Sequence, residues 1–296
     1  MTSEEKFIDL HIHSNCSDGA YAPVEIVERA ATVGLSAIAL ADHDSVSGID
    51  PALTATQKHG IELIPAVELS VKYQQWKDVH LLGYGIDHTN PAFTASLDEF
   101  RQRRKNRNAE ILEKINAKLA IEAKEPISVE EVLAYAADTI GRPHIARAML
   151  KRGYVNNIED AFQRYLIPCN VPKLYWPIAD AINHIKEIGG VPVLAHPTSI
   201  TNDRTQLTNI VQELAKAGLE GIEVYNNMAQ PEEMEFLRRR AAENNLLTTA
   251  GSDFHGIEQG LEIGRGRNGI RFSSRLLDTL KLKISINQTN YNKSKQ

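Results

Sequence analysis

The sequence predicts an α/β fold in which about seven buried strands close into a barrel-like sheet, interrupted by one helical segment. Seven short apolar runs recur along the chain, and most are continuous rather than alternating, as is typical of strands covered on both faces. Helical patterns separate several runs, and strand–helix alternation is typical of a parallel sheet. The runs lie near residues 7–13, 37–43, 61–71, 78–86, 191–196, 221–225 and 247–253.

Three helices between these runs are predicted from their end signals. Residues 23–33 begin with proline and precede Gly34, the asymmetry that favours proline in the first turn and glycine just past the last. Residues 206–217 precede Gly218 in the same way, and residues 231–244 begin with proline. Such helices supply the crossovers that parallel strands require.

The alternation stops between residues 91 and 187, where only helical patterns occur. Asn90-Pro91 is typical of a helix start, and a long helical pattern follows to about Lys124. Ser128 begins a shorter helix with the capping-box pattern Ser-Val-Glu-Glu. We therefore predict a discontinuous barrel domain (1–90 and 188–284), a helical insertion domain (91–187) and a frayed polar tail (285–296).

Composition excludes several classes of protein. The net charge of −5 gives no global attraction to nucleic acid, so any polyanion must be drawn by local charge or bound metal. Cys16 and Cys169 are the only cysteines, which argues against a disulfide framework and fits a reducing compartment. No apolar stretch approaches the roughly 20 residues of a membrane span. With a polar start and no signal peptide, we expect a cytoplasmic protein without membrane partners.

Metal-binding types of side chain stand at the ends of the apolar runs. His11 and His13 close the first run, and the alternation of side chains along a strand points both to the same side. In βα barrels, functional side chains lie at the C-terminal ends of the strands, so residues that come last in their strands converge on one mouth. Glu223 stands in the sixth run, without an assigned role. The candidate ligands are His11, His13, Asp18, His43, Glu68, His80, His196, Asp253 and His255.

This number of ligands exceeds the needs of one ion, so the sequence predicts two or three divalent ions. An isolated His-x-His pair is more often structural, but the recurrence of ligand types along the whole chain favours a metal centre. Imidazole and carboxylate ligands suit manganese, iron or zinc, with Mn²⁺ as the first expectation and Fe²⁺ or Zn²⁺ as alternatives. Clustered ions hold a hydroxide at neutral pH and neutralise phosphoryl oxygens, so we expect phosphate ester hydrolysis without a protein nucleophile.

These motifs resemble the polymerase and histidinol phosphatase (PHP) superfamily from about residue 6 to residue 270. The stretches that carry the resemblance are Asp9-Leu-His-Ile-His-Ser, Ser17-Asp-Gly, Ala41-Asp-His-Asp, Pro65-Ala-Val-Glu-Leu-Ser, His80-Leu-Leu-Gly, Leu194-Ala-His-Pro and Gly251-Ser-Asp-Phe-His. The resemblance implies a distorted seven-stranded βα barrel with a trinuclear metal centre. It assigns His11, His13, Glu68 and Asp253 to the first ion, Glu68, His80 and His196 to the second, and Asp18, His43 and His255 to the third.

The insertion resembles one branch of that superfamily. Gly141-Arg-Pro-His-Ile-Ala-Arg is similar to a stretch in the 3′,5′-nucleoside bisphosphate phosphatases, which overlap with bacterial 5′-to-3′ exoribonucleases. The resemblance implies that Arg142 and His144 reach a substrate phosphate, and a guanidinium fork can pair two phosphate oxygens. Residues 167–173 depart from the family's glycine-rich loop, so the resemblance gives no basis for a contact from Lys173.

A basic run, Arg101-Gln-Arg-Arg-Lys-Asn-Arg107, occurs early in the insertion. Such a run can guide a nucleic acid backbone, but it contains no aromatic residue for base stacking. We therefore favour a solvated helical face, with one or two arginines turned toward the mouth as the open alternative.

Together these features favour a metal-dependent phosphoesterase that removes phosphate from 3′,5′-nucleoside bisphosphates such as adenosine 3′,5′-bisphosphate, and that also acts on short 5′-phosphorylated RNA. A dedicated 5′-to-3′ exoribonuclease and a histidinol-phosphate-type phosphatase are the alternatives. Hydrolysis of a carbon–nitrogen bond ranks low, because barrel amidohydrolases use a lysine carboxylate bridge where Glu68 stands here. A purely structural metal module also ranks low, since such modules lose ligands and none is missing. No obligate protein partner is indicated.

Overall fold

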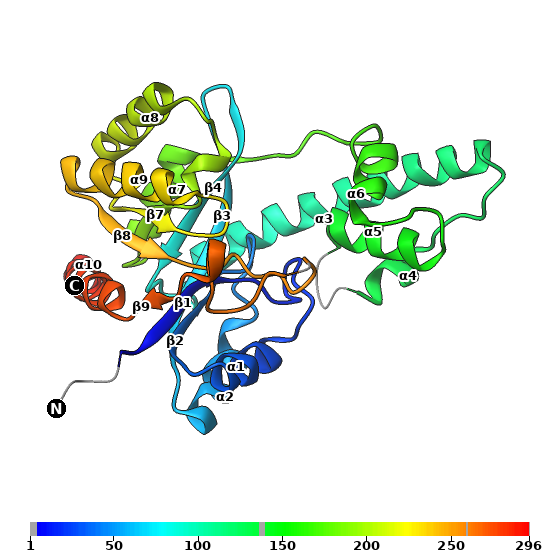
Figure 1. Ribbon diagram of the computed structural model, residues 1–296. Helices are drawn as coiled ribbons and strands as arrows, with labels where there is room; N and C mark the ends of the chain where they lie inside the picture. Colours follow the sequence, from blue (N-terminus) through cyan, green and yellow to red (C-terminus); the bar gives the residue numbers. More distant parts are fainter. Residues whose placement is uncertain (1–4, 136–139, 259, 296) are drawn as a thin grey trace.

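The computed structural model describes residues 5–135, 140–258 and 260–295 (Figure 1). Their strands form one sheet in the order β8-β7-β6-β4-β3-β2-β1-β9, with β5 paired to β3. The strands are β1 (Phe7–Ile12), β2 (Leu35–Leu40), β3 (Glu62–Tyr73), β4 (Trp76–Tyr84), β5 (Trp176–Pro177), β6 (Val191–Leu194), β7 (Gly221–Tyr225), β8 (Leu247–Ala250) and β9 (Phe272–Ser273). The seven predicted runs are the seven longest of these, and the barrel-like α/β fold is confirmed.

The segment after β8 closes the sheet against β1. The Asp253 backbone N–H donates to the His11 carbonyl oxygen at 2.9 Å, and the His13 N–H donates to the Phe254 carbonyl oxygen at 2.9 Å. Gly251 permits this approach, because a Cβ atom there would lie 2.2 Å from the His11 Cβ. The closure therefore brings His11, His13 and Asp253 to one end of the barrel.

The expectation of a parallel sheet is wrong at β4, and the short strand β9 also pairs antiparallel with β1. Strand β4 runs antiparallel to both β3 and β6, whereas β1–β2, β2–β3, β6–β7 and β7–β8 are parallel pairs. Strands β3 and β4 are joined by a two-residue turn at Gln74, which has a positive φ of 52°. A parallel connection needs a crossover of about a dozen residues, so this short link permits only a hairpin.

Helices cover the outside of the sheet (Figure 1). The predicted helices at 23–33, 206–217 and 231–244 are confirmed to within one or two residues at each end. The covering helices are α1 (Pro23–Thr32), α2 (Ile49–His59), α7 (Ile178–Glu187), α8 (Arg204–Lys216), α9 (Pro231–Glu243) and α10 (Arg275–Ser294). Short 3₁₀ turns occur at η2 (Pro197–Ser199) and η3 (Arg267–Gly269). No helix in the described ranges is long and apolar enough to cross a membrane.

The chain between β4 and β6 forms a helical lobe beside the barrel (Figure 1). Its elements are α3 (Pro91–Ile121), α4 (Val129–Leu133), α5 (Arg142–Lys151), α6 (Ile158–Ala161) and the π-helical turn η1 (Phe162–Leu166). This lobe has its own apolar core, which includes Ile111, Ile145 and Tyr165. The first turns of α3 and all of α7 instead pack into the core of the barrel. The division at residues 90 and 187 stays a prediction, and the packing places α7 with the barrel.

The frayed tail expected from residue 285 is wrong, because α10 continues to Ser294. Its polar side chains bind neighbouring loops. Asn287 Nδ2 donates to the Gly190 carbonyl oxygen at 2.9 Å, and Gln288 Nε2 donates to the Gly85 carbonyl oxygen at 3.1 Å. The polarity of this segment therefore serves packing against loop backbone.

Candidate metal centre

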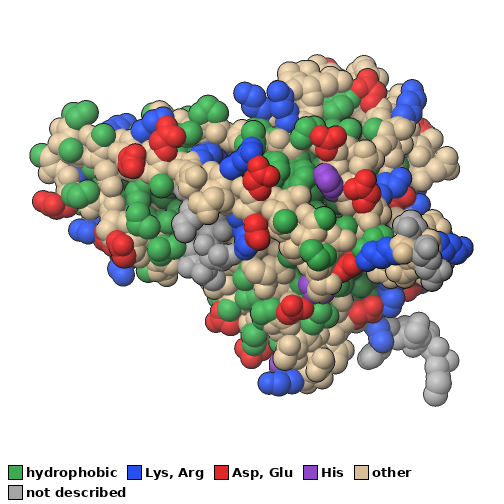
Figure 2. All heavy atoms as spheres, turned by 180° about the vertical axis from the view of Figure 1, so that it is seen from behind, with side chains coloured by type: hydrophobic (Ala, Val, Ile, Leu, Met, Phe, Trp, Pro, Cys, Tyr) green, Lys and Arg blue, Asp and Glu red, His purple; other side chains and the backbone are tan. Residues whose placement is uncertain are grey.

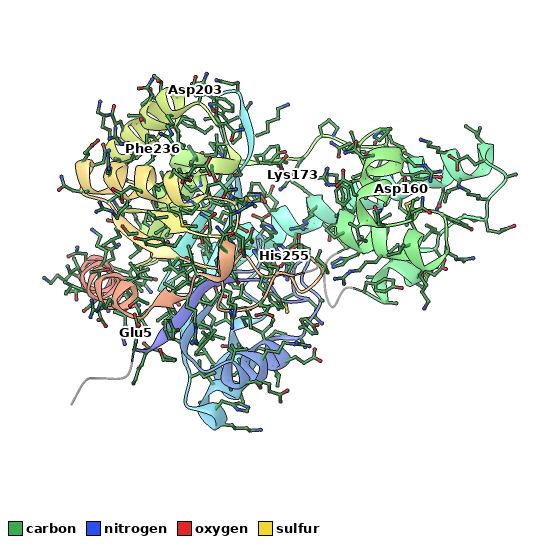
Figure 3. All side chains as sticks on the ribbon, viewed as in Figure 1. Glu5, Asp160, Lys173, Asp203, Phe236 and His255 are labelled. Carbon is green, nitrogen blue, oxygen red and sulfur yellow. The ribbon has the colours of Figure 1, made fainter. Side chains whose placement is uncertain are left out.

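Histidine and carboxylate side chains gather at the end of the barrel that faces the helical lobe, around His255 in Figure 3. Eight of the nine predicted ligands fall into three groups whose ligand atoms lie within 4.8 Å of one another. His196 adjoins them, with its Nε2 atom 3.2 Å from Glu68 Oε1 and 3.3 Å from His80 Nδ1. The structure thus brings all nine side chains together.

The His-x-His pair behaves as strand geometry predicts. His11 and His13 are fully buried and point to the same side of β1, with their Nε2 atoms 3.1 Å apart. Each Nε2 atom also lies 3.3 Å from one oxygen of Glu68. Glu68 therefore contacts both imidazoles, one with each of its oxygens.

The expectation that every ligand comes last in its strand is wrong for two residues. Glu68 lies in the middle of β3, opposite Leu82, and His80 lies in β4 opposite Ser70. The β3–β4 hairpin extends past the ends of the neighbouring strands, so these two side chains reach the mouth from mid-strand. An isolated β-bridge pairs His43 with Glu68, and at this point β3 extends beyond the end of β2.

The three groups correspond closely to those that the resemblance implied. The first contains His11, His13, Glu68 and Asp253. Another joins His43, Glu68 and His80, and the remaining one joins His13, Asp18, His43 and His255. Because His13 and His43 each adjoin two groups, the assignment of ligands to individual ions stays a prediction.

Buried carboxylate oxygens without hydrogen-bond partners show that the cluster fits divalent cations. Asp18 Oδ1, Glu68 Oε2 and Asp253 Oδ1 accept no hydrogen bond within the described part of the chain. A buried anionic oxygen costs several kcal/mol unless a cation or donor offsets its desolvation, so this arrangement requires positive charge. Oxygen and imidazole donors at this density suit a polynuclear site of first-row divalent ions.

Two side chains of the cluster, Glu68 and His43, are in the protonation states that bind metal ions. His255 is not, because, against the effect of burial, Asp18 and Asp253 raise its pKa to about 10, so a bound ion would have to displace that proton. Burial alone would raise the pKa of the Glu68 carboxyl, but His43, His80 and His11 beside it hold that pKa well below its usual range. Burial lowers the pKa of His43 to about 4, so its imidazole is neutral at pH 7. An ionised carboxylate and a neutral imidazole are the forms that bind metal ions.

Glu223, which is not among the candidate ligands, contacts two of them, His11 and His196. The His11 Nδ1 atom lies 2.9 Å from Glu223 Oε1, and the His196 backbone N–H donates to Glu223 Oε2 at 2.9 Å. All of these groups are buried. A carboxylate that holds the far nitrogen of a metal-binding histidine fixes its tautomer and increases its basicity. Sequence reasoning gave Glu223 no role, although its place in the run 221–225 was a usable signal.

Two further buried carboxylates hold the backbone that carries ligands. Asp42 accepts hydrogen bonds from Ser14 and Ser17, which fixes the loop that bears Asp18. Asp9 accepts from the Ser252 backbone N–H at 2.9 Å, next to the ligand Asp253. Both lie inside the quoted motifs, but sequence reasoning did not assign them these positioning contacts.

Two of the candidate ligands have a strained backbone. His196 and Asp253 have positive φ angles of 25° and 55°, a region that side chains with a Cβ atom rarely adopt. Strain of this kind persists where surrounding structure enforces it, and it clusters at functional sites.

A cavity of about 300 Å³ opens directly beside the cluster. Four cationic side chains line it together with three candidate ligands. These cations are Arg104, Arg107, Arg142 and Lys173. Arg104 Nη2 lies 3.6 Å from Asp18 Oδ2, so the cationic wall adjoins the metal ligands. Seen from behind, basic and acidic side chains are interspersed over the surface (Figure 2).

The basic run divides between two faces of α3. Arg101 and Arg103 pair with Asp98 and Glu99 one turn earlier, as a solvated face predicts. Arg104 lines the cavity, as does Arg107, whose Nε donates to the Val171 carbonyl oxygen at 2.7 Å. The favoured interpretation is therefore wrong for these two arginines, and the open alternative is confirmed.

The residues expected to bind substrate phosphate occupy different places. Arg142 lines the cavity, whereas His144 is fully buried and its Nδ1 accepts a hydrogen bond from the Gly141 N–H at 3.0 Å. That bond caps α5, so the predicted contact of His144 with substrate stays a prediction. Lys173, on the segment between the lobe and β5 (Figure 3), lies 3.4 Å from Asp78. The departure of residues 167–173 from the family's pattern put a substrate contact from Lys173 in doubt, yet the side chain lines the cavity.

Comparison with known proteins gives a consistent result. Residues 9–255 match the PHP domain family. The chain is 34% identical over 263 residues to a 5′-3′ exoribonuclease of Haemophilus influenzae, covering 88% of this chain and 94% of that protein. It is 32% identical over 258 residues to a 3′,5′-nucleoside bisphosphate phosphatase of Chromobacterium violaceum, covering 86% and 88%.

Solved structures agree on the fold. A candidate metal-dependent phosphoesterase from Bifidobacterium adolescentis superposes with a TM-score of 0.81 at 28% identity, covering 94% of this chain and 96% of that one. A chain from Chromobacterium violaceum described as an amidohydrolase, with bound sulfate and no metal, has a TM-score of 0.79 at 30% identity, covering 93% and 96%. With its barrel-like sheet and clustered buried ligands, the chain belongs to the PHP family and is a metal-dependent phosphoesterase.

Proposed function

We propose that the chain removes the 3′-phosphate from 3′,5′-nucleoside bisphosphates, such as adenosine 3′,5′-bisphosphate. The observation that carries this proposal is the cationic cavity beside the metal ligands. A substrate with one phosphate at the ligand cluster would place a second phosphate, one ribose away, against the cationic side chains. The second phosphate would neutralise their charge. A simple monophosphate would leave excess positive charge in this wall, although Arg104 lies beside Asp18 and Lys173 beside Asp78.

The nine clustered side chains are proposed to hold two or three divalent ions, with Mn²⁺ first and Fe²⁺ or Zn²⁺ as alternatives. When bound, such ions supply a hydroxide nucleophile and neutralise charge on the phosphoryl oxygens. Glu68 is central to this arrangement because it adjoins His11, His13, His43, His80 and His196. The protein contributes no covalent nucleophile in this proposal.

The second phosphate is held by the cationic cavity. The Arg142 guanidinium can pair two phosphate oxygens at once, and Lys173 adds a point charge from the opposite segment. Arg104 is fixed between this cavity and Asp18, so it sets the spacing between the two phosphates. His144 supports the same phosphate indirectly by capping the helix that carries Arg142.

The test is phosphate release by purified protein loaded with Mn²⁺. Adenosine 3′,5′-bisphosphate, adenosine 3′-monophosphate and histidinol phosphate are compared at equal concentration. We expect the bisphosphate to have the highest kcat/KM. Absence of turnover there, with good turnover of histidinol phosphate, would contradict the proposal.

A second candidate function, 5′-to-3′ exoribonuclease activity, is favoured by the similarity to the Haemophilus influenzae protein. Release of nucleoside 5′-monophosphates from 5′-phosphorylated RNA cleaves the same bond, between the 3′-oxygen and phosphorus. A ladder of shortened products from 3′-labelled RNA would support this activity, and unchanged RNA would remove it.

A further inference from the structure

The cationic cavity contains one carboxylate that the proposed function does not use. Among the described residues that line this cavity, two are acidic, Asp18 and Asp78. Asp18 is a candidate metal ligand, whereas Asp78 belongs to none of the three ligand groups. Its Oδ1 atom lies 3.4 Å from Lys173 Nζ, in the wall proposed to bind the second phosphate. A negative charge at this place opposes the binding of phosphate, so Asp78 must affect the affinity of the cavity for anions.

The backbone at Asp78 is distorted beside the cavity. Asp78 lies in a β-bulge of the β3–β4 hairpin, where the pairing passes from Val71 opposite Val79 to Tyr73 opposite Trp76. Its φ angle is 55°, in the left-handed region. A bulge re-aims side chains, and a residue with a Cβ atom keeps such a φ angle only where the surrounding structure enforces it. The hairpin therefore fixes the place of this carboxylate beside Lys173.

Asp78 has the properties of a counter-ion that a stronger anion can displace. Its side chain is 54% exposed, so it is ionised at neutral pH, and water solvates it when it leaves Lys173. An ion pair with this exposure is weak. A phosphate monoester carries about 1.5 to 2 negative charges at pH 7 and three strong acceptor oxygens. Such a phosphate therefore competes successfully with the carboxylate for the same ammonium group.

Lys173 has a second acidic neighbour that remains when Asp78 is displaced. Burial lowers the pKa of Lys173, and the negative charge of Asp44 opposes this effect more strongly than that of Asp78 does. Asp44 is buried, and its Oδ1 atom accepts a hydrogen bond from the Ser70 backbone N–H at 3.0 Å. Lys173, which lies between the barrel and the helical lobe in Figure 3, therefore keeps an attractive partner without Asp78.

We propose that Asp78 is an internal counter-ion of the cationic cavity: its carboxylate occupies the place of the second phosphate in the free protein and returns there as the nucleotide product leaves. This inference rests on the proposed function, in which the product is a nucleoside 5′-phosphate whose phosphate still lies against Arg142 and Lys173. A wall of four cations without an internal anion would retain that product. Asp78 therefore weakens the binding of substrate and product alike and favours release.

The test uses the Mn²⁺-loaded protein and the variant Asp78→Asn. Isothermal titration calorimetry measures Kd for adenosine 5′-monophosphate, and steady-state kinetics measure KM for adenosine 3′,5′-bisphosphate and adenosine 3′-monophosphate. Asparagine tolerates a positive φ angle, so the bulge should persist, and thermal unfolding verifies the fold. Glu62→Gln is the matched control, since Glu62 is a partly exposed carboxylate on β3 that pairs with Lys281 at 2.8 Å and does not line the cavity.

We expect Asp78→Asn to lower Kd for adenosine 5′-monophosphate and KM for the bisphosphate about fivefold, the effect of removing a charge interaction of about 1 kcal/mol. KM for adenosine 3′-monophosphate should stay unchanged, because this substrate places no second phosphate in the cavity. Glu62→Gln should change none of the three values.

Unchanged or weaker binding in Asp78→Asn would overturn the inference, and weaker binding would show that Asp78 instead positions Lys173. Equal tightening for adenosine 3′-monophosphate, or the same effect in Glu62→Gln, would also overturn it by revealing a general effect of net charge. Wild-type protein without preference for the bisphosphate over the 3′-monophosphate would refute the proposed function. The calorimetric titration would still decide the role of Asp78 in that case, because it does not depend on turnover.

Discussion

Glu223 Oε1 lies 2.9 Å from His11 Nδ1, and both side chains are fully buried. The other Glu223 oxygen accepts the His196 backbone N–H, so one carboxylate orients two candidate ligands from different strands. This contact leaves His11 Nε2 directed toward Glu68 and Asp253. The candidate ligands are therefore positioned by a further buried carboxylate. Replacing this carboxylate should have measurable consequences.

Replacing Glu223 should weaken metal binding without removing a ligand. Glu223→Gln keeps an oxygen for one hydrogen bond but loses the negative charge that increases the basicity of His11. We expect about 10- to 100-fold weaker metal affinity, measured by titrating the metal-free protein with Mn²⁺. Activity should recover at high Mn²⁺ concentration. Wild-type affinity in this variant would show that Glu223 is merely a packing group.

Replacing Glu68 should have a larger effect that excess metal does not reverse. Glu68→Gln removes the carboxylate that adjoins five of the histidines, so every ion that this carboxylate would hold should lose a ligand. We expect fewer bound ions per chain by elemental analysis and phosphate release at least about 100-fold lower. Glu62→Gln, at the exposed start of the same strand, is the control and should keep full metal content. Equal metal content in both variants would contradict a bridging role.

Metal removal should lower stability as well as activity. The ions bind the folded chain and not the unfolded one, so at a free concentration 100 times the dissociation constant they contribute about 2.7 kcal/mol. We expect treatment with a chelator to lower Tm by several degrees and to abolish phosphate release, and Mn²⁺ to restore both. Differential scanning calorimetry measures the shift. A Tm indifferent to chelator and metal would mean that the buried carboxylates do not hold ions.

Replacing Arg142 should raise KM for the bisphosphate. The side chain lines the cationic cavity beside the candidate ligands, so its loss should affect binding of the second phosphate. A charge-assisted hydrogen bond contributes about 1.5–3 kcal/mol, which corresponds to a 10- to 100-fold increase in KM for Arg142→Ala. Hydrolysis of adenosine 3′-monophosphate should change little. Arg103→Ala, on the outer face of α3, serves as the control. Equal losses on both substrates would place Arg142 elsewhere in the reaction.

The sequence predicted the strands and ligand types well because both depend on local patterns. Buried strands appear as apolar runs, and ligands appear as His, Asp or Glu near their ends. The antiparallel direction of β4 could have been predicted from the short gap between the runs at 61–71 and 78–86, because this gap leaves no room for a crossover. That signal was present and was not used.

Other features depend on contacts between distant segments. Arg104 and Arg107 share the face of α3 that continues to the buried Ile111, so helical phase separates them from Arg103. Lys173 gave no comparable signal, because its place at the cavity depends on how the segment before β5 crosses the mouth. The packed C-terminal helix was missed because its polar residues bind loop backbone rather than solvent.

The most direct test of the account is the ratio of kcat/KM for adenosine 3′,5′-bisphosphate to that for adenosine 3′-monophosphate with the Mn²⁺-loaded protein. A metal cluster with a cationic cavity beside it should favour the bisphosphate by at least about tenfold, the effect of one charge-assisted contact. Equal values for the two substrates, or no phosphate release from either, would contradict the proposed pairing of metal centre and phosphate cavity.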